Sequence, residues 1–410
     1  MTLSQLENIS KEYGTPFYLM DGDQYLRNIN SFKDAFKSRC NLVFGYSFKT
    51  NYVPALCKIA KDAGCYAEVV SEMEYALAKR IGFRNIIFNG PIKKEGILKE
   101  ALSGQAIVNL DSQYEIDTVL QYQDEHPEKE ISVGLRLNID LTDETGNSKV
   151  QCGLRVGRFG FTPDILEKII PRLKERGIKI ISLHGHTSSS DRAVVNYEII
   201  VRQMLQICGR FKLDDLRYFD VGGGFFGAAA DGVDISHKPK YVDYANCILD
   251  VCCNNEWFNK INPTIVIEPG VSVTANVFSY VSKIFQVKDI AGQKFITTDG
   301  SVFDIKPTLH NNNLPHTFYA HKAGHGSIKA NLVGSTCMEK DIILKDVEVP
   351  SSIDYGDFVK IDGAGAYTIA LTPTFINYLS PIIEVKDDKV FVVRRRQTVD
   401  DIISLYNLDD

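Results

Sequence analysis

The stretch NLVFGYSFK (Asn41–Lys49) decides the fold, because it opens a series of eight similar segments. Each segment is a short apolar or β-branched run that ends near a polar or glycine residue, and stretches of helical character fill the gaps between them. The other seven are YAEVVS (Tyr66–Ser71), NIIFNG (Asn85–Gly90), AIVNLD (Ala106–Asp111), ISVGLRLNI (Ile131–Ile139), KIISLHGH (Lys179–His186), YFDVGGG (Tyr218–Gly224) and TIVIEPG (Thr264–Gly270). Most are apolar almost throughout, which is typical of parallel strands buried on both faces. Eight such units in succession predict an α/β fold with a (βα)8 TIM barrel.

The segments between the strands carry helix signals. Val53–Ala63 places apolar residues on one face before Gly64 stops it. Thr162 is placed to be an N-cap before Pro163, and Gly177 closes the same helix. A doubly wound open sheet is the competing arrangement, but it commonly has five or six strands. The count of strands therefore favours the barrel.

The pattern changes after Gly270. Segments such as FSYVSKIFQV, DFVKIDGA and KVFVVRRR are rich in β-formers, and no convincing helix of three turns precedes Val399–Leu405. The segment Thr15–Asp21 is also strand-like, and we expect it to pair with the later sheet. We thus predict a barrel over residues 26–272, and a β-sandwich or β-barrel domain made of residues 1–25 and 273–410.

The composition limits the partners. The chain has 410 residues, 44% apolar and 24% charged, with a net charge of −6, so nothing indicates nucleic-acid binding. Its nine cysteines form no CxxC pair, which gives no metal-site pattern and favours a reducing cytoplasm. The N-terminus lacks the apolar stretch of a signal peptide, and no run is long enough to span a membrane.

Polar residues gather where the predicted strands end, and in such barrels these ends carry the functional groups. Burying so many polar groups unpaired would cost several kcal/mol, so their convergence on one mouth indicates an active site. The residues in question are Lys49, Glu68, Ser71, Asn89, Asp111, Arg136, Asn138, His184, His186, Gly222, Gly223, Gly224 and Glu268.

Three of these features together point to one cofactor. A lysine after an apolar strand, as at Lys49, can form a Schiff base, although a lone lysine is more often a surface residue. The glycines at Gly222–Gly224 leave N–H groups open to a phosphate, although alone they could be a flexible turn. The carboxylate of Glu268 could keep a pyridine nitrogen protonated. The combination predicts pyridoxal 5′-phosphate.

The same residues carry a family resemblance over nearly the whole chain. The motifs are YSFKTN (Tyr46–Asn51), EVVSEMEY (Glu68–Tyr75), HGHTSSS (His184–Ser190), FDVGGGF (Phe219–Phe225), EPG (Glu268–Gly270), STCMEKD (Ser335–Asp341) and GDFVKIDGAGAY (Gly356–Tyr367). In order and spacing the chain resembles the fold-type III pyridoxal-phosphate decarboxylases, which include diaminopimelate and ornithine decarboxylases. The resemblance implies decarboxylation of an α-amino acid by a homodimer with shared active sites.

The resemblance also implies roles for single residues. Lys49 would be the Schiff-base residue with Glu68 near it, His186 would stack on the cofactor ring, and Glu268 would hold the pyridine nitrogen. Cys337 would be the catalytic cysteine that reaches the neighbouring subunit's site, and either Cys337 or Lys49 would protonate the product. The other residues expected to contact the cofactor are Arg136, Ser189, Gly222, Gly223, Gly224, Gly270 and Tyr367. Without the resemblance, Cys337 and Tyr367 would be taken for core residues.

Departures from the family pattern concern the substrate. Val271 stands where the family usually has arginine, and Lys306-Pro307 occupies the place of the Arg-Pro that holds the distal carboxylate in diaminopimelate decarboxylases. Met338 replaces a glutamate, with Glu339 adjacent. Lysine is a poor substitute for the arginine fork, so we expect a modified amino acid as substrate, contacted by Lys306, His310, Met338 and Glu339. A fold-type III racemase and a non-catalytic cofactor-binding or regulatory homologue are the alternatives.

Overall fold

The chain forms two compact units. A computed structural model describes residues 1–407 except 38, 105 and 144. One unit comprises Leu26–Gly227 and Ser236–Val273, and the other comprises Met1–Tyr25, Ala228–Ile235 and Thr274–Asp410. The short segment Ala228–Ile235, which lies inside the predicted barrel range, thus groups with the second unit.

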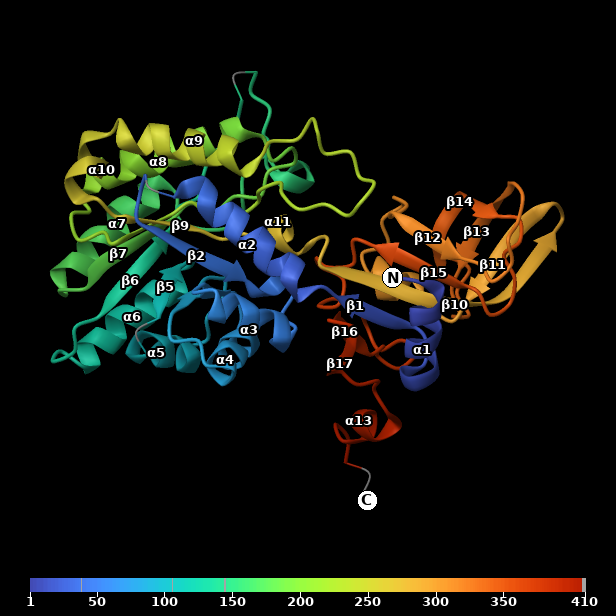
Figure 1. Ribbon diagram of the computed structural model, residues 1–410. Helices are drawn as coiled ribbons and strands as arrows, with labels where there is room; N and C mark the ends of the chain where they lie inside the picture. Colours follow the sequence, from blue (N-terminus) through green and yellow to red (C-terminus); the bar gives the residue numbers. More distant parts are fainter. Residues whose placement is uncertain (38, 105, 144, 408–410) are drawn as a thin grey trace. The chain divides into compact units, whose positions relative to one another are not determined.

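The first unit is a closed barrel of parallel strands (Figure 1). Its strands are β2 (Leu42–Ser47), β3 (Tyr66–Val69), β4 (Ile86–Phe88), β5 (Ile107–Leu110), β6 (Ser132–Arg136), β7 (Lys179–His184), β8 (Tyr218–Asp220) and β9 (Thr264–Ile267). Each pairs with the next, and β2 pairs with β9 to close the ring. Each lies within one of the eight predicted segments, so the predicted barrel is confirmed.

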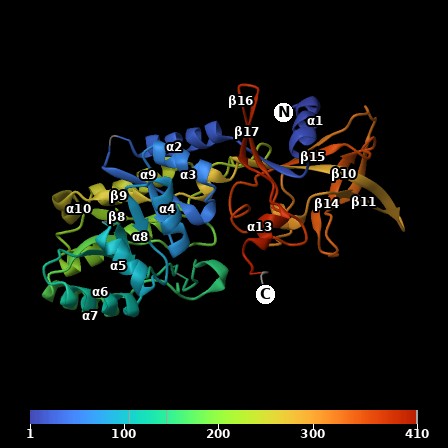
Figure 2. The ribbon, with the colours of Figure 1, turned by 90° about the horizontal axis from the view of Figure 1, so that it is seen from below.

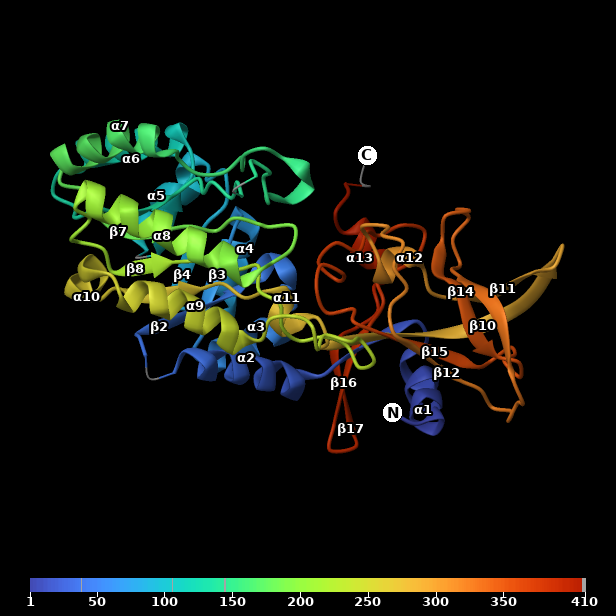
Figure 3. The same ribbon diagram turned by 90° about the horizontal axis from the view of Figure 1, so that it is seen from above.

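Helices cover the outside of the barrel, as the view in Figure 3 shows. They are α2 (Gly22–Phe36), α3 (Pro54–Asp62), α4 (Glu72–Ile81), α5 (Glu95–Ser103), α6 (Gln113–Glu125), α7 (Pro163–Glu175), α8 (Val194–Phe211), α9 (Tyr241–Cys253), α10 (Glu256–Ile261) and α11 (Val271–Thr274), with 3-10 turns η1 (Phe48–Thr50) and η2 (Gln151–Gly153). The predicted N-cap Thr162 does precede α7, but its side chain makes no capping hydrogen bond. Pro163, with its fixed φ, therefore sets the start of that helix.

The side chains that point into the barrel differ between its two ends. Away from the mouth, Val43, Ile87, Ile107 and Val266 form a buried apolar cluster. The strands' carboxyl ends instead carry buried polar groups, among them Glu68, Asn89 and Glu268. Among the described residues, no helix combines the length and the apolar character needed to cross a membrane.

The second unit is built around a large sheet, seen in Figure 2. Its strands are β1 (Phe17–Met20), β10 (Phe278–Ile290), β11 (Gln293–Thr298), β12 (His316–Tyr319), β13 (Ser327–Val333), β14 (Ile342–Pro350), β15 (Phe358–Asp362), β16 (Ile382–Lys386) and β17 (Lys389–Arg394), with α12 (Val302–Ile305) and α13 (Val399–Ile403). Strand β1 lies between β10 and β16, antiparallel to the first and parallel to the second. The N-terminal strand and the later strands thus belong to one sheet.

Helix α1 (Leu3–Tyr13) was not predicted from the sequence. An isolated helix of this length is only marginally stable in water, and most residues of α1 are polar. Tertiary contacts and a capping box between Thr2 and Gln5 stabilise it, because Leu6 and Ile9 pack into a core cluster with Phe17 of the sheet.

His321 ties α1 to the sheet. Its Nε2 lies 2.8 Å from Glu7 Oε1 on the helix, and its Nδ1 lies 2.6 Å from Asp357 Oδ1. The hydrogen bonds to Asp357 and Glu7 raise the pKa of His321 above its usual value of 6.5. The charged imidazolium is therefore the form that stabilises the folded unit.

We predict a pH-dependent loss of stability in His321→Ala. Because the folded-state pKa is raised, the contribution is fully present below about pH 6.5 and disappears as the pH rises through the folded-state pKa. The pair is partly exposed, so the effect should stay below about 1 kcal/mol. Urea unfolding from pH 5.5 to pH 9 measures it. His325→Ala is the control, and an equal effect of His321→Ala at both ends of the range would contradict the prediction.

Candidate active site

A buried carboxylate anchors the amine of Lys49 at the barrel mouth. Lys49 lies in η1, directly after β2, and its Nζ donates to Glu68 Oε2 at 3.0 Å. Glu68 on β3 is fully buried, and the same oxygen accepts a hydrogen bond from Ser47 Oγ at 2.6 Å. The ion pair holds the lysine side chain at the mouth in a single direction.

Asn89 joins this pair to a second carboxylate. Its Nδ2 donates to Glu68 Oε1 at 3.0 Å and to Glu268 Oε1 at 2.6 Å. Asn109 fixes the amide orientation, because its own Nδ2 donates to Asn89 Oδ1 at 2.8 Å. One polar network thus links five strands, β2, β3, β4, β5 and β9, near their carboxyl ends.

Arg136 and Asn138 support loops rather than standing free in the mouth. Arg136 forms a buried ion pair with Asp111 at 3.0 Å, and its Nη2 donates to the carbonyl of His186 at 3.1 Å. Asn138 donates to the carbonyls of Gly157 and Phe159. Arg136, predicted to contact the cofactor, therefore holds the backbone that carries His186.

The two histidines of strand β7 and its loop are neutral. Their rings stack at 8° with centroids 6.1 Å apart. Desolvation at the mouth lowers the pKa of both well below 6.5, helped by Arg136 at His184 and by Lys49 at His186. Nδ1 of His186 accepts the N–H of Gly223 at 3.1 Å, which fixes the ring. A fixed, uncharged ring suits stacking against a planar ligand.

The glycine loop after β8 is packed too closely for side chains. Gly222 and Gly224 have φ of +73° and +93°, which favour glycine. A Cβ at Gly222 would lie 2.3 Å from His186 Cβ, and one at Gly223 would lie 2.2 Å from Glu268 O. The loop thus needs glycine both for its conformation and for its contact with the neighbouring strand ends.

Gly270 and Ser189 complete the predicted rim. A Cβ at Gly270 would lie 2.1 Å from the hydroxyl of Thr50, beside Lys49. Ser189 Oγ accepts the N–H of Arg192 at 3.1 Å. An amine, a neutral ring, a buried carboxylate and a glycine cradle within one mouth fit a planar pyridine ring that carries a phosphate.

The remaining predicted site residues belong to the second unit. Cys337 is exposed, and the loop around it is held by buried Asp341, which accepts from Thr336 Oγ1 at 2.6 Å and from Val302 N at 2.6 Å. Met338 accepts the N–H of Asp341 through its carbonyl, and Glu339 is exposed. Tyr367 is 39% exposed and has φ of +52°. Neither Cys337 nor Tyr367 is thus a core residue.

Lys306 and His310 also lie together in the second unit. Lys306 is 4% exposed, and its Nζ contacts the carbonyl of Asn312 at 3.5 Å. Burial lowers the pKa of Lys306. Desolvation, followed by the charge of Lys306, lowers the pKa of His310. The two residues therefore lie close enough to interact electrostatically.

The sequence reasoning missed Ser47, Asn109 and Asp220. Each is a buried polar residue within or at the end of an otherwise apolar strand. That contrast was the available signal, since a polar residue in a buried strand needs a partner.

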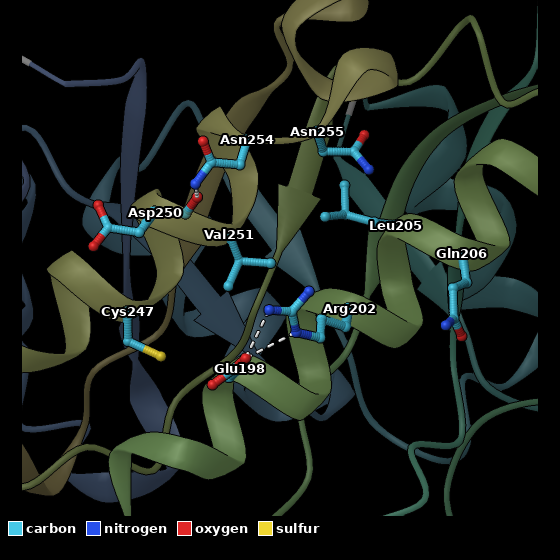
Figure 4. A pocket seen from close by; sticks show the side chains of 9 residues that line it. All are labelled: Glu198, Arg202, Leu205, Gln206, Cys247, Asp250, Val251, Asn254 and Asn255. Carbon is cyan, nitrogen blue, oxygen red and sulfur yellow. Dashed lines mark hydrogen bonds and ion pairs between the residues drawn. The ribbon is translucent and has the colours of Figure 1, made fainter.

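A groove elsewhere on the barrel holds none of the predicted residues. It lies on the helical outer surface of α8 and α9 and has a volume of about 600 Å³ (Figure 4). The Glu198–Arg202 ion pair on α8 and Asp250 on α9 line it. Because it lies away from the carboxyl ends of the strands, it is separate from the mouth.

Known proteins resemble this chain along its whole length. The family described as pyridoxal-dependent decarboxylase, pyridoxal binding domain, matches residues 23–275. A probable chloroplastic diaminopimelate decarboxylase of Oryza sativa subsp. japonica is 27% identical over 96% of this chain and 80% of its own length. The L-glutamyl-[BtrI acyl-carrier protein] decarboxylase of Niallia circulans is 28% identical over 98% of this chain and 97% of its own length. The structure of Helicobacter pylori diaminopimelate decarboxylase complexed with L-lysine has a TM-score of 0.84 at 23% identity, covers 98% of both chains, and supports the fold.

We predict that Gly223→Ala weakens binding of pyridoxal 5′-phosphate. The added Cβ would meet Glu268 O at 2.2 Å, so the loop must move away from the strand end. Relieving such overlap costs about 1–3 kcal/mol, which corresponds to roughly tenfold to hundredfold weaker binding. Cofactor absorbance in a titration measures it. Gly209→Ala is the matched control, because a Cβ at Gly209 meets nothing within 4 Å. Wild-type affinity in Gly223→Ala would contradict the prediction.

Proposed function

Because this chain belongs to the pyridoxal-dependent decarboxylases, it is an amino-acid decarboxylase that uses pyridoxal 5′-phosphate, and we propose that its substrate is a modified amino acid other than diaminopimelate. The observation that carries the assignment of the site is the buried network from Lys49 through Glu68 and Asn89 to Glu268. It joins the amine of Lys49 to the buried carboxylate of Glu268, which we propose as the partner of the pyridine nitrogen.

The cofactor, when bound, supplies an electron sink for the electron pair left by the departing carboxylate. In our proposal Lys49 attaches the cofactor and Glu68 orients its amine at 3.0 Å. The neutral ring of His186 would stack on the ring of the bound cofactor, and Glu268 would keep its pyridine nitrogen protonated. Lys49 or Cys337 returns a proton to the α-carbon after the carboxylate has left.

The substrate proposal rests on the second unit. Lys306 stands where the family's diaminopimelate enzymes carry an arginine, and its burial lowers its pKa. A lysine ammonium is a point charge and offers no bidentate fork to a distal carboxylate. The Niallia circulans relative shows by its name that a decarboxylase similar to this chain acts on an amino-acyl group held by a carrier protein. The names of the other relatives favour diaminopimelate itself, which is therefore the competing substrate.

The two other activities considered from the sequence have less support. An amino-acid racemase of this fold normally leaves the pyridine nitrogen to an arginine, whereas this chain has buried Glu268. A non-catalytic homologue would not need both Lys49 and Cys337, which are present. The relatives above are all named as decarboxylases.

We also propose a homodimer in which Cys337 and Tyr367 complete the partner's site. The segment after Tyr367 exposes large apolar side chains, which are typical of a surface that another chain covers. They are Leu371, Phe375, Ile376 and Tyr378. All nine cysteines are free thiols, which suits the reducing compartment that we expect.

We predict that diaminopimelate is a poor substrate. In CO2-release assays its kcat/KM should lie at least about a hundredfold below that of the best of a panel of amino acids and side-chain acyl or amide derivatives, since the distal carboxylate lacks an arginine fork. Lys306→Arg should raise the diaminopimelate value about tenfold, and Lys306→Met should not. Lys49→Ala is the inactive control. Diaminopimelate as the best substrate of the wild type would contradict the proposal.

We predict that two inactive variants restore activity when mixed. If each site takes Lys49 from one copy and Cys337 from the other, random exchange of Lys49→Ala and Cys337→Ala subunits gives about a quarter of wild-type activity. Each variant alone should stay inactive, which for Cys337→Ala requires that Cys337 rather than Lys49 returns the proton. Differently tagged subunits that purify together prove the exchange. Exchange without recovery would contradict the shared site.

A further inference from the structure

We propose that Asp220 is held as a neutral carboxylic acid that donates its proton in a hydrogen bond to the carboxylate of Glu268. Asp220 is then a positioning residue for the pyridine-nitrogen partner. The inference rests on the proposed role of Glu268, but its first test measures the protonation of Asp220 itself.

Asp220 is a buried carboxyl group, and one of its two oxygens lacks a hydrogen-bond partner among the described residues. It ends β8 inside the barrel and is fully buried, and its Oδ1 accepts the N–H of Gly222 at 2.9 Å. Its Oδ2 is also buried and has no hydrogen-bond partner in the described part of the chain. The carboxylate of Glu268 and the ring of His184 each bring an atom within 4.8 Å of it. An ionised Oδ2 there would be a desolvated charge beside a second carboxylate.

The charges around the mouth leave no cation for Asp220. Among the described residues, Lys49 is paired with Glu68 at 3.0 Å, and Arg136 is paired with Asp111 at 3.0 Å. The buried Lys93 is paired with Glu115. His184 beside Glu268 is uncharged, because its pKa lies well below 6.5. Glu268 and Asp220 thus lie near one another with no cation from the described residues paired to either of them.

Two buried carboxylates in this position cannot both be ionised, so they share a proton. Glu268 already has a donor, since Asn89 Nδ2 lies 2.6 Å from its Oε1, whereas His184 Nε2 lies 3.4 Å from its Oε2 without a hydrogen bond between them. Asp220 Oδ2 has none. Burial, and then the charge of Glu268, raise the pKa of Asp220 well above its usual value, which agrees with this placement of the proton.

The proton on Asp220 helps to decide whether the pyridine nitrogen of a bound cofactor stays protonated. A hydrogen bond donated to Glu268 stabilises its ionised form and lowers its affinity for a further proton. The proton shared between Glu268 and the pyridine nitrogen then stays on nitrogen. An ionised Asp220 would have the opposite effect, because a second negative charge makes Glu268 more basic.

Infrared spectroscopy of the holoenzyme tests the protonation directly. At neutral pH the wild type should show the carbonyl band of a protonated carboxylic acid, which shifts when aspartate is labelled with 13C. The band should be absent from Asp220→Asn. A wild-type spectrum without a label-sensitive acid band would overturn the proposal. This readout does not depend on activity, so it separates a failure of this inference from a failure of the proposed function.

Two variants and a control test the positioning role. Asp220→Asn keeps a hydrogen-bond donor and should retain kcat/KM within about threefold, whereas Asp220→Ala should lose roughly tenfold to a hundredfold, the scale of a hydrogen bond to a charged group. In Asp220→Ala the absorbance of the bound cofactor should also respond differently to pH. Ser182→Ala removes another buried, unpartnered oxygen of the barrel and controls for packing. Asp220→Asn as impaired as Asp220→Ala would overturn the proposal.

Discussion

The fully buried carboxylate of Glu68 is the constraint on which the barrel mouth depends. A desolvated carboxylate costs several kcal/mol unless donors surround it, and here Ser47, Lys49 and Asn89 supply them. Ser47 lies on β2, Lys49 lies in the turn after β2, and Asn89 directly follows β4. Ser47 lies directly opposite Glu68 in the β2–β3 register, so a slip of one residue would leave the charge without its closest donor. The register of the barrel and the direction of the lysine are therefore fixed together.

The same device recurs around the rim. Asp111 accepts from Arg136 and from the N–H of Gly160, and so holds the loop after β6. Glu115 is fully buried with Lys93 and accepts the N–H groups of both Lys93 and Asp111. In both cases a buried carboxylate accepts hydrogen bonds from a neighbouring strand end or loop and so fixes the position of that loop. Catalysis by fixed dipoles and charges needs this rigidity, because groups already in place require no reorganisation.

Much of this architecture could be predicted from the sequence, for a physical reason. Parallel strands buried on both faces are apolar locally, so the segment from Asn41 to Lys49 and its seven counterparts were recognisable without any tertiary knowledge. Helix α1 was not, because its stability comes from packing against the sheet rather than from its own residues. The neighbours of Asn109 and Asp220 could not be predicted either. They lie on other strands, and which strand ends come together depends on how the barrel closes.

Cofactor chemistry and substrate choice follow from the sequence to different degrees. The groups expected to hold the cofactor lie on strand ends of one unit, where neighbouring atoms leave no room for a side chain at Gly222 or Gly223. The groups expected to contact the substrate lie on loops of the other unit, and there the charge of a residue is not enough to predict which substrate it binds. Lys306 has the same sign of charge as the arginine that the family resemblance leads us to expect there, but it is buried and its ammonium lacks the guanidinium fork. In our proposal the chemistry at Lys49 is therefore kept, while the exchange at Lys306 alters the substrate.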